Sequence, residues 1–526
     1  MRNGIGPGRR LQGIGFAVAM AVPIFGGGCG TPQLGIGGAS PSLDRTGSVP
    51  LPPPVSNAAA LLAVEPASGP VGTVVTLTGV RLDPRDRVVV SSPILDETDI
   101  PVLATTPTAI RVALPDLKLN LPTSLDVRVR RADGNTLGPL PFRLRPGRTW
   151  YVATDGDDRN DGGAAAPFRS AKAALRRMSP GDVAYLRAGN YAESIQIEGS
   201  GTDGAPLTVS GLPGEDVLVS LPAGVGGDTV SVRGSFVVVD RLRVTNLGMQ
   251  GAGIGIAADA YHATISHCEV FGAPGQGIMV SGGNNLIAHN HVHHNGTHAA
   301  HDHGVYVEGS RNFVHDNVIH DNYAYGVHVY NGWDQTPSGN NTVQYNLVYH
   351  NGYGTLIDDP ISPSAGIAVA LHGENTTIQY NRVCANAQFG IYVIDDQPRA
   401  HVIGNVTCDN DRGAIYFSAP GADATAFDNV SYNDEVFALA GGDNVTSDRN
   451  TFYTRVDQPR FVWNRRTFSR LEDYQAATRQ DRQSRIAAPN FRAGPDTAFD
   501  LARAQQYDFC TTLIPALCEL PQDPIP

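Results

Sequence analysis

The chain has 526 residues, of which 17% are charged, with 59 glycines, 37 prolines and a formal net charge of −12. This length suffices for two or three domains, and the many turn-forming residues favour β structure. The acidic balance argues against nucleic acid as a partner, because binding to phosphate groups requires basic patches.

The first 29 residues have the pattern of an export signal. Arg9 and Arg10 precede an apolar run over residues 14–25, which is too short to span a membrane and ends in small residues before Cys29. The FGGGC arrangement resembles a bacterial lipoprotein signal, although Gly26 stands where leucine is usual. This resemblance implies lipidation of Cys29, and plain secretion is the alternative. We therefore expect an exported protein that is anchored by lipid at the outer membrane or cell surface, or is secreted, and that has no other contact with a membrane.

Two segments follow the signal. Residues 30–61 are rich in Gly, Pro and Ser, which predicts a disordered tether. Residues 62–146 contain short alternating strands with turn signals at the spacing of a β-sandwich. Their opening, PASGPVGTVVTLTG, resembles the IPT/TIG family of immunoglobulin-like domains. Members of that family act as spacers, adhesive modules or carbohydrate-associated modules, so the resemblance implies a fold and leaves the role open.

The segment 149–197 predicts the start of a second domain with a short helix. Phe168, Ala171, Leu175 and Met178 share one helical face, and Pro180 ends the helix. The segment resembles the opening of many exported β-helix proteins, including polysaccharide lyases and glycoside hydrolases. An open solenoid end exposes its core, so we expect this amphipathic helix to cap it.

Residues 253–432 repeat with a period of 22 to 35 residues. Each period holds three short alternating strands, one of them beginning Gly-apolar-x-apolar, which is typical of a solenoid. We predict an all-β chain whose main domain is a right-handed parallel β-helix over residues 149–464, followed by a cap and tail over 465–526. The anchor residue of each period stands at Cys268, Asn290, Asn317, Asn346, Asn381, Asn405 and Asn429.

Asparagine at the same bend of successive coils predicts a ladder along the solenoid axis. Each side-chain amide then donates to the next carbonyl oxygen, which satisfies a polar group that would otherwise be costly to bury. A second asparagine follows five residues after most anchors, for example Asn322 after Asn317. In the Gly-apolar strands, alternation places the first and third residues after glycine inward and the second and fourth outward, facing water.

Those outward positions gather polar and aromatic side chains on two adjacent coils. Tyr306 and Glu308 stand on one coil and His328 and Tyr330 on the next. Tyrosine rings stack on sugar rings, while histidine and carboxylates bind hydroxyl groups, so we expect an extended polysaccharide as the partner of a monomeric chain. The remaining candidates come from the preceding bend and a later coil, at Asp302, His303 and Tyr392.

The chemistry of this patch has alternatives. A lyase or epimerase of uronic acids needs a base, for which we consider His328 or Tyr306, and a positive charge at the carboxylate, which Arg311 would supply. His303 is a further catalytic candidate. A lysine base, as in pectate lyases of this fold, is excluded because no lysine follows Lys172. A glycoside hydrolase needs two carboxylates. Its candidates are Glu308 with Asp302, Asp358 or Asp359. A non-catalytic adhesin or glycan-binding envelope protein, with the solenoid as a rod, is the main rival to an enzyme.

A run of histidines crowds one coil and its bend. Imidazoles of neighbouring coils can share a metal such as zinc, but no spaced metal motif is present. We favour a structural role, with metal binding and acid–base work as alternatives. Calcium or zinc is thus compatible with the sequence, while no motif requires either. The run comprises His289, His291, His293, His294, His298, His301 and His303, with His315 and His320 on the next coil.

The cysteines predict disulfides in an exported chain. Cys384 and Cys408 occupy equivalent places in successive coils, about 4.8 Å apart, which a disulfide accepts. Cys510 and Cys518 are expected to close a small loop near the end. Cys268 occupies an anchor position, and we expect it to be a buried free thiol.

Overall fold

The computed structural model describes residues 58–297, 301–330, 338–354, 364–371, 373–394, 399–418, 423–432, 434, 437–453 and 460–487. The predicted signal segment and most of the predicted tether lie outside these residues. So do Cys29, Cys510, Cys518, Asp358 and Asp359. Within the described residues, no helix is long and apolar enough to cross a membrane.

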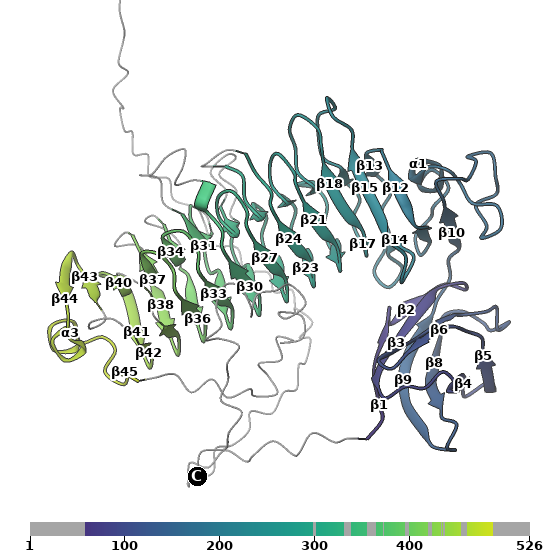
Figure 1. Ribbon diagram of the computed structural model, residues 1–526, viewed down its shortest axis with the longest axis horizontal. Coiled ribbons are helices and arrows are strands. Elements are labelled where there is room, and N and C mark those ends of the chain that lie inside the picture. Colours follow the sequence, from purple (N-terminus) through teal and green to yellow (C-terminus); the bar gives the residue numbers. More distant parts are fainter. Residues whose placement is uncertain are drawn as a thin grey trace, which may run out of the picture. The chain divides into compact units, whose positions relative to one another are not determined.

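The first described domain consists of two sheets that enclose one apolar core (Figure 1). Leu77 and Ile110 of one sheet and Val129 and Phe142 of the other are fully buried there. The predicted β-sandwich is confirmed, while its assignment to the IPT/TIG family stays a prediction. The first sheet has the order β1 (Ala60–Glu65), β3 (Val74–Val80), β7 (Ala109–Ala113) and β6 (Val102–Thr106). The second has the order β2 (Ser68–Gly69), β9 (Thr136–Leu144), β8 (Thr123–Arg130), β4 (Arg87–Ser92) and β5 (Leu95–Ile100).

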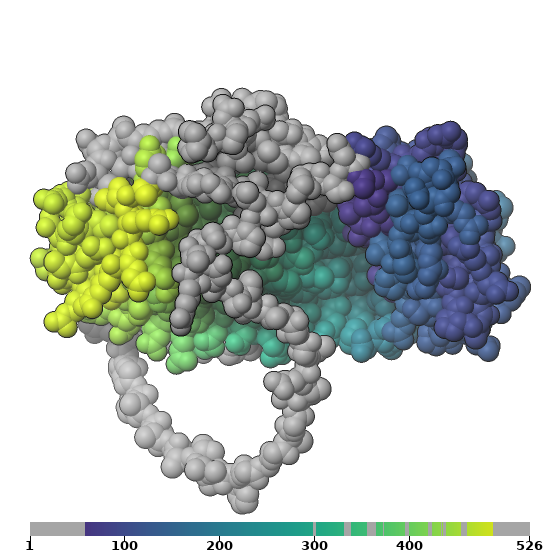
Figure 2. All heavy atoms as spheres, turned by 90° about the horizontal axis from the view of Figure 1, so that it is seen from below, coloured from purple at the N-terminus to yellow at the C-terminus, as the bar shows by residue number. Residues whose placement is uncertain are grey.

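In the part of the chain that the structure describes, the second domain is a parallel β-solenoid with three sheets of 12 strands, which confirms the predicted fold class. Figure 2 shows its coils stacked in chain order, from teal to yellow. Its first sheet contains β10 (Thr149–Val152), β11 (Val183–Leu186), β14 (Leu207–Gly211), β17 (Val237–Asp240), β20 (Thr264–Ser266), β23 (Leu286–Ala288), β26 (Phe313–His315), β29 (Thr342–Gln344), β32 (Thr377–Gln379), β35 (His401–Ile403), β38 (Ala424–Phe427) and β41 (Val445–Asp448).

The other two solenoid sheets run alongside the first. The second sheet contains β12 (Gly189–Tyr191), β15 (Val217–Leu221), β18 (Arg243–Asn246), β21 (Glu269–Phe271), β24 (His291–His293), β27 (Val318–His320), β30 (Leu347–Tyr349), β33 (Arg382–Cys384), β36 (Val406–Cys408), β39 (Val430–Tyr432), β42 (Thr451–Tyr453) and β45 (Arg485–Ile486). The third contains β13 (Ile195–Ile197), β16 (Val230–Val232), β19 (Ile254–Ile256), β22 (Ile278–Val280), β25 (Val305–Val307), β28 (Val327–Val329), β31 (Ala365–Val369), β34 (Phe389–Val393), β37 (Gly413–Phe417), β40 (Phe437–Gly441), β43 (Phe461–Trp463) and β44 (Arg466–Phe468).

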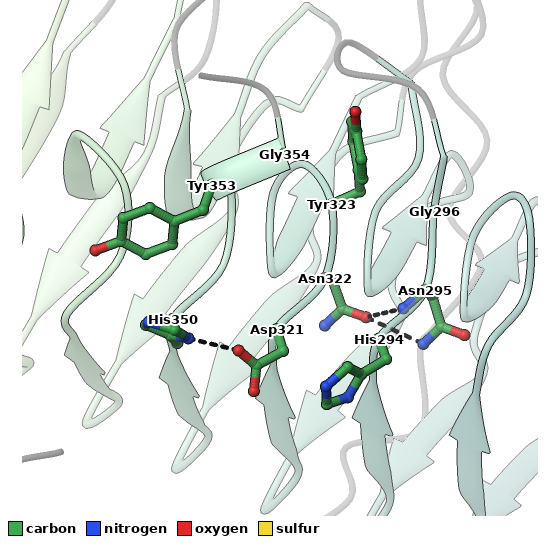
Figure 3. A pocket seen from close by; sticks show the side chains of 9 residues that line it. All are labelled: His294, Asn295, Gly296, Asp321, Asn322, Tyr323, His350, Tyr353 and Gly354. Carbon is green, nitrogen blue, oxygen red and sulfur yellow. Dashed lines mark hydrogen bonds and ion pairs between the residues drawn. The ribbon is translucent and has the colours of Figure 1, made fainter. Parts of the chain in front are cut away.

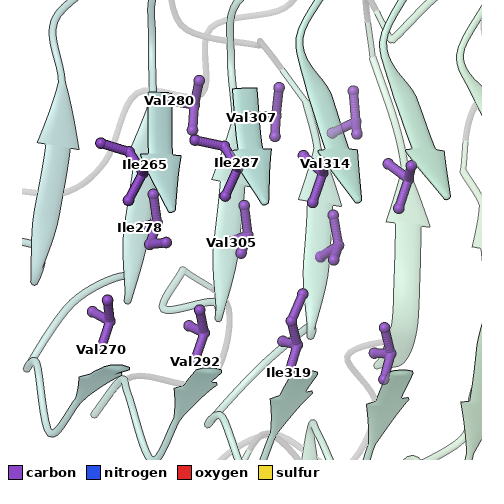
Figure 4. Packing of buried hydrophobic residues seen from close by; sticks show 14 of the residues in the cluster. Ile265, Val270, Ile278, Val280, Ile287, Val292, Val305, Val307, Val314 and Ile319 are labelled. Carbon is purple, nitrogen blue, oxygen red and sulfur yellow. The ribbon is translucent and has the colours of Figure 1, made fainter. Parts of the chain in front are cut away.

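Aliphatic side chains from all three sheets fill the solenoid and stack coil upon coil (Figure 4). Ile265 pairs with Ile287 in the first sheet, and Val270 pairs with Val292 in the second. All four side chains are fully buried. Because inward residues alternate with outward ones along each strand, this core follows directly from the predicted pattern.

The predicted asparagine ladders are present at two bends of the solenoid. The amide nitrogen Nδ2 of Asn317 donates to Oδ1 of Asn346 at 2.9 Å, and the main-chain N–H of Asn317 donates to the same oxygen at 3.0 Å. In the second ladder, Nδ2 of Asn322 donates to Oδ1 of Asn351 at 2.9 Å. The first ladder continues to Asn450, and the second ends at Asp434, which replaces asparagine as the last acceptor.

A helix closes each described end of the solenoid. Helix α1 (Ala171–Leu175) begins after Ser170, whose hydroxyl accepts a hydrogen bond from the N–H of Ala173. Its buried residues join the solenoid core, so the predicted capping helix is confirmed. At the far end, Tyr474 of α3 (Leu471–Thr478) is fully buried and stacks on Phe461 at 4.9 Å.

Candidate functional site

The outer face of the third sheet brings together aromatic residues of two coils. Tyr306 of β25 and His328 of β28 are register partners, and their rings stack at 5.5 Å. Tyr330, just past β28, stacks on His328 at 5.3 Å with an interplanar angle of 11°. The structure therefore places these three predicted site residues side by side, and we call them, together with His303, the aromatic cluster.

His303 reaches the aromatic cluster from the bend before β25. Its Nδ1 accepts a hydrogen bond from the N–H of Tyr325 at 3.3 Å, so its own proton belongs on Nε2. This Nε2 lies 3.0 Å from Nδ1 of His328, to which it donates. The chain of hydrogen bonds thus assigns the proton of His328 to Nε2, which is buried and has no hydrogen-bond partner among the described residues.

Burial keeps both imidazoles of this pair neutral. Together with a smaller effect from His301, it lowers the pKa of His328 to about 3. Burial also holds the pKa of His303 well below the ordinary value, with a smaller effect from the neighbouring His328. Near neutral pH, His328 therefore presents an N–H group without carrying a charge.

The expectation that the outward positions face water is wrong for several residues. Tyr306 is 6% exposed, His328 8% and Tyr392 7%, and Ala368 is fully buried. These side chains do point away from the solenoid core, but rings on successive strands lie close enough to cover one another. Glu308 and Tyr330, at the ends of their strands, keep intermediate exposure.

The remaining candidates lie around the aromatic cluster rather than in it. Oε2 of Glu308 accepts a hydrogen bond from the hydroxyl of Ser281 at 2.7 Å. Oδ2 of Asp302 accepts one from the N–H of Thr297 at 2.9 Å, so this carboxylate also organises its bend. The exposed Arg311 stands at a corner with φ of 57°, where its Nε donates to Oδ1 of Asn284 at 2.9 Å.

Tyr392 belongs to a neighbouring group of rings on the third sheet. It stacks on Tyr416 at 5.3 Å and packs beside Phe389 at 5.2 Å. Tyr325 belongs to the same apolar group and also contacts the ring of His303 at 5.1 Å. The predicted substrate-binding Tyr392 is thus connected to the aromatic cluster through packing.

The cysteines of adjacent coils occupy matching positions. Cys384 of β33 and Cys408 of β36 are register partners and form a disulfide with their Cα atoms 4.5 Å apart. Cys268 is a free, buried thiol, and burial raises its pKa to about 12. Such a thiol is not a nucleophile near neutral pH.

A cavity of about 270 Å³ lies at the bend between the second and third sheets (Figure 3). The sequence analysis did not select Asp321, His350 or Tyr353, which line it with His294 and Tyr323. Nδ1 of His350 hydrogen-bonds to Oδ1 of Asp321, and the two side chains point toward each other. Burial alone would raise the pKa of Asp321, but hydrogen bonds from His320 and His350 lower it to about 2.

The fold is a right-handed parallel β-helix of the pectin lyase-like type. Residues 150–410 match the family model described as Pel9A-like, right handed beta helix region. This part of the chain is therefore similar to the Pel9A-like β-helix region.

Two curated proteins resemble short parts of the chain. The uncharacterized protein YwoF of Bacillus subtilis (strain 168) is 36% identical over 70 residues, which cover 13% of this chain and 15% of that protein. Pectate lyase PEL9 of Emericella nidulans is 38% identical over 71 residues, which cover 13% of this chain and 17% of that protein. The matches thus span less than a fifth of either relative.

Solved structures of similar architecture include two lyases. Pectate lyase Pel9A has a TM-score of 0.43 and 16% identity, with 58% of this chain and 79% of that chain covered. The alginate lyase from Paenibacillus sp. str. FPU-7 has a TM-score of 0.42 and 18% identity, with 58% of this chain and 99% of that chain covered.

Proposed function

We propose that this protein binds an extended polysaccharide on the outer face of the third sheet and acts there on a uronic acid glycan, as a lyase or epimerase. The match of residues 150–410 to a Pel9A-like region and the partial likeness to a pectate lyase support this class. The observation that carries the proposal is the buried Nε2 of His328, which has no hydrogen-bond partner among the described residues.

The aromatic cluster suggests a role for each of its members. The N–H at Nε2 of His328 donates to the uronate carboxylate and stabilises the negative charge that develops when C5 loses its proton. Tyr306 in its phenolate form receives that proton and becomes the neutral phenol. In a lyase, the electron pair of the C5–H bond forms the C4=C5 double bond, the C4–O bond breaks, and the phenol of Tyr306 gives its proton to the leaving oxygen, which restores the phenolate. In an epimerase, water delivers a proton to the opposite face of C5, and the Tyr306 phenol gives its proton to the resulting hydroxide.

The surrounding residues bind the polymer in this proposal. Tyr330 and Tyr392 offer the exposed parts of their rings to sugars, and Glu308 and Asp302 offer acceptors for hydroxyl groups. His303 positions His328 through the hydrogen bond between their imidazoles. Arg311 supplies positive charge at the nearby corner.

The cellular setting is also part of the proposal. The first 29 residues direct export, and Cys29 carries the lipid that anchors a monomeric chain. Residues 62–146 act as an IPT/TIG-type spacer between the anchor and the β-helix. Labelling with radioactive palmitate in the native host, compared with a Cys29→Ala variant, tests the anchor.

The activity is tested with a panel of polygalacturonate, alginate and neutral polysaccharides. Unsaturated uronate products are followed by ultraviolet absorbance, and epimerisation by proton NMR of the polymer. Tyr306→Phe and His328→Phe keep the stacked rings and are expected to lower the rate about 10²–10⁴-fold. Tyr345→Phe and His401→Phe, on the first-sheet side, are the matched controls. Activity that survives both cluster variants would place the reaction elsewhere.

The stacked rings of Tyr392 and Tyr416 favour a second candidate, a glycan-binding protein without catalysis. A row of rings along the solenoid binds successive sugars whether or not a bond is broken. Binding in the same panel that weakens in Tyr392→Ala, with no product formed from any polymer, would select this alternative.

A further inference from the structure

Three imidazoles converge on the second sheet, away from the aromatic cluster of the third. His291 and His293 stand on the same face of β24, and His320 of β27 is the register partner of His293. Each ring offers a nitrogen, and the three nitrogens lie within 4.8 Å of one another. Nε2 of His291 is 2.6 Å from Nε2 of His320.

Two of these rings, those of His320 and His293, each have one nitrogen within hydrogen-bond distance of a carboxylate. Nδ1 of His320 is 2.6 Å from Oδ2 of Asp321, and Nε2 of His293 is 3.3 Å from Oε1 of Glu269. A carboxylate at one ring nitrogen fixes the proton there and leaves a lone pair on the other. For His320, this lone pair belongs to Nε2, the atom that faces His291. For His293, it belongs to Nδ1, which also lies 2.8 Å from Nδ1 of His294.

Ring stacking explains part of this arrangement but not all of it. Phe271, His293, His320 and Tyr349 occupy one slot of successive coils, with ring separations of 5.6, 5.1 and 4.6 Å. An aromatic residue of any kind would serve there. The slot of His291 has Glu269 and Val318 as its neighbours, so stacking along the sheet gives no reason for an imidazole at that position.

We propose that His291, His293 and His320 bind a late first-row divalent metal ion such as zinc. Neutral imidazole is a good ligand for these ions, and a carboxylate behind the ligand is their usual outer partner. Three protein ligands leave a fourth position for water or another ligand. Asp321, which positions His320, also lines the cavity of Figure 3, so solvent reaches the neighbourhood of the three rings.

The proposed metal site is independent of the proposed glycan activity, because the two use different residues on different sheets. Zinc binding is measured by isothermal titration calorimetry on the full chain, made without a polyhistidine tag and stripped with a chelator. We expect one ion per chain. X-ray absorption at the zinc edge is expected to show three nitrogen ligands at about 2.0–2.1 Å.

Two substitutions remove a ligand while keeping the packing of the slot. His320→Phe retains a ring between His293 and Tyr349, and His291→Val copies Val318 of the next coil. Each is expected to weaken zinc binding more than a hundredfold. Asp321→Asn, which removes only the orienting charge, is expected to weaken it about 10–100-fold. Thermal unfolding without metal checks that each variant folds. If His320→Phe does not fold, the zinc affinity of His291→Val alone tests the proposal.

His401→Phe and His315→Ala are the controls for the loss of a histidine elsewhere. His315 belongs to another candidate group, with His289 and Asp316. Unchanged zinc affinity in His291→Val would overturn the proposal. Loss of zinc binding in His315→Ala would also overturn it. The same holds if His294→Ala loses zinc binding while His291→Val keeps it, because either result places the ion in a different group of residues.

Discussion

Nε2 of His303 lies 3.0 Å from Nδ1 of His328, although the two residues are 25 positions apart in the chain. The bend before β25 carries His303, and the strand of the next coil carries His328 on its outer face. Both imidazoles are buried, so neither has water to stabilise a positive charge. The pair therefore connects the stability of the third sheet to pH.

We expect acid to destabilise the protein through this pair. The pKa of His328 is lowered to about 3 in the folded chain, whereas an unfolded histidine has a pKa of about 6.5. The unfolded state therefore binds more protons between these values, and the stabilisation present above pH 6.5 is lost as pH falls toward 3. Between pH 7 and pH 5, His328 alone accounts for a loss of about 2 kcal/mol.

Urea unfolding of the wild type and His328→Phe across this pH range measures the effect. Between pH 7 and pH 5, the free energy of unfolding should fall by about 2 kcal/mol less in the variant than in the wild type. His401→Phe is the control and should follow the wild type. Parallel curves for the wild type and His328→Phe would contradict a buried neutral His328.

We expect the contribution of Asp434 to stability to depend on pH in the opposite direction. Its oxygens accept hydrogen bonds from Asn410, Thr407 and Ser431, and burial raises its pKa to about 7. Its protonated form is favoured in the folded chain, so its contribution to stability is complete below the unfolded pKa and is lost as pH rises through 7. As pH rises from 5 to 7, the free energy of unfolding of Asp434→Asn should increase by about 2 kcal/mol relative to that of the wild type. The exposed Asp203→Asn should show no such gain in chemical unfolding.

Removing one step of the first ladder should destabilise the solenoid strongly. Nδ2 of Asn317 donates to the carbonyl oxygens of Ile287 and His315 and to Asn346, and its Oδ1 accepts from Asn290. Asn317→Ala leaves these buried groups without partners, at a cost of about 3 kcal/mol. Thermal unfolding measures it. The control Asn190→Ala removes an exposed amide that accepts one hydrogen bond from Ser220, and should cost less than about 1 kcal/mol.

The sequence was sufficient to predict the ladders because their spacing is a property of the chain alone. Asn317 and Asn346 repeat with the coil, so their contact follows from the period. The proton on Nε2 of His328 could not be predicted, because it depends on the Tyr325 N–H reaching His303 across the bend. The period places residues in neighbouring coils, but it does not orient hydrogen bonds.

Asp321 and His350 of the cavity were missed for a different reason, although His294 beside them was part of the predicted histidine run. His294, Asp321 and His350 have φ values of 54°, 51° and 56°, which belong to the left-handed region. Strand alternation no longer predicts the direction of a side chain at such a corner. Their shared position, one residue before an asparagine of the second ladder, was the signal that could have identified them as neighbours.

The disulfide predicts a measurable dependence on reducing agent. Cys384 and Cys408 are separated by 24 residues, and closing a loop of this length stabilises a protein by about 3 kcal/mol. Thiol titration under denaturing conditions should find the pair oxidised in the exported protein. The double variant Cys384→Ala/Cys408→Ala should lose about 3 kcal/mol in urea unfolding, and reducing agent should then destabilise it less than it destabilises the wild type.

From β22 to β34, the glycine at the start of each third-sheet strand lies against an asparagine amide of the second ladder. A Cβ atom at Gly326 would lie 2.8 Å from Nδ2 of Asn351 and 2.7 Å from the carbonyl oxygen of Gly366. The same close approach to an asparagine amide recurs at Gly304 and Gly390. Neither the ladder nor the backbone can move without breaking hydrogen bonds, so we expect Gly326→Ala to cost about 2–3 kcal/mol.

Gly226→Ala provides the matched control for this prediction. A Cβ atom there would come no closer than 3.7 Å to the flexible side chain of Gln250, so the stability should change by less than about 1 kcal/mol. Thermal and urea unfolding of both variants separate the contact with the ladder from a general effect of replacing glycine. Equal stability of the two variants would mean that the recurrence of glycine beside the asparagine amides has another cause.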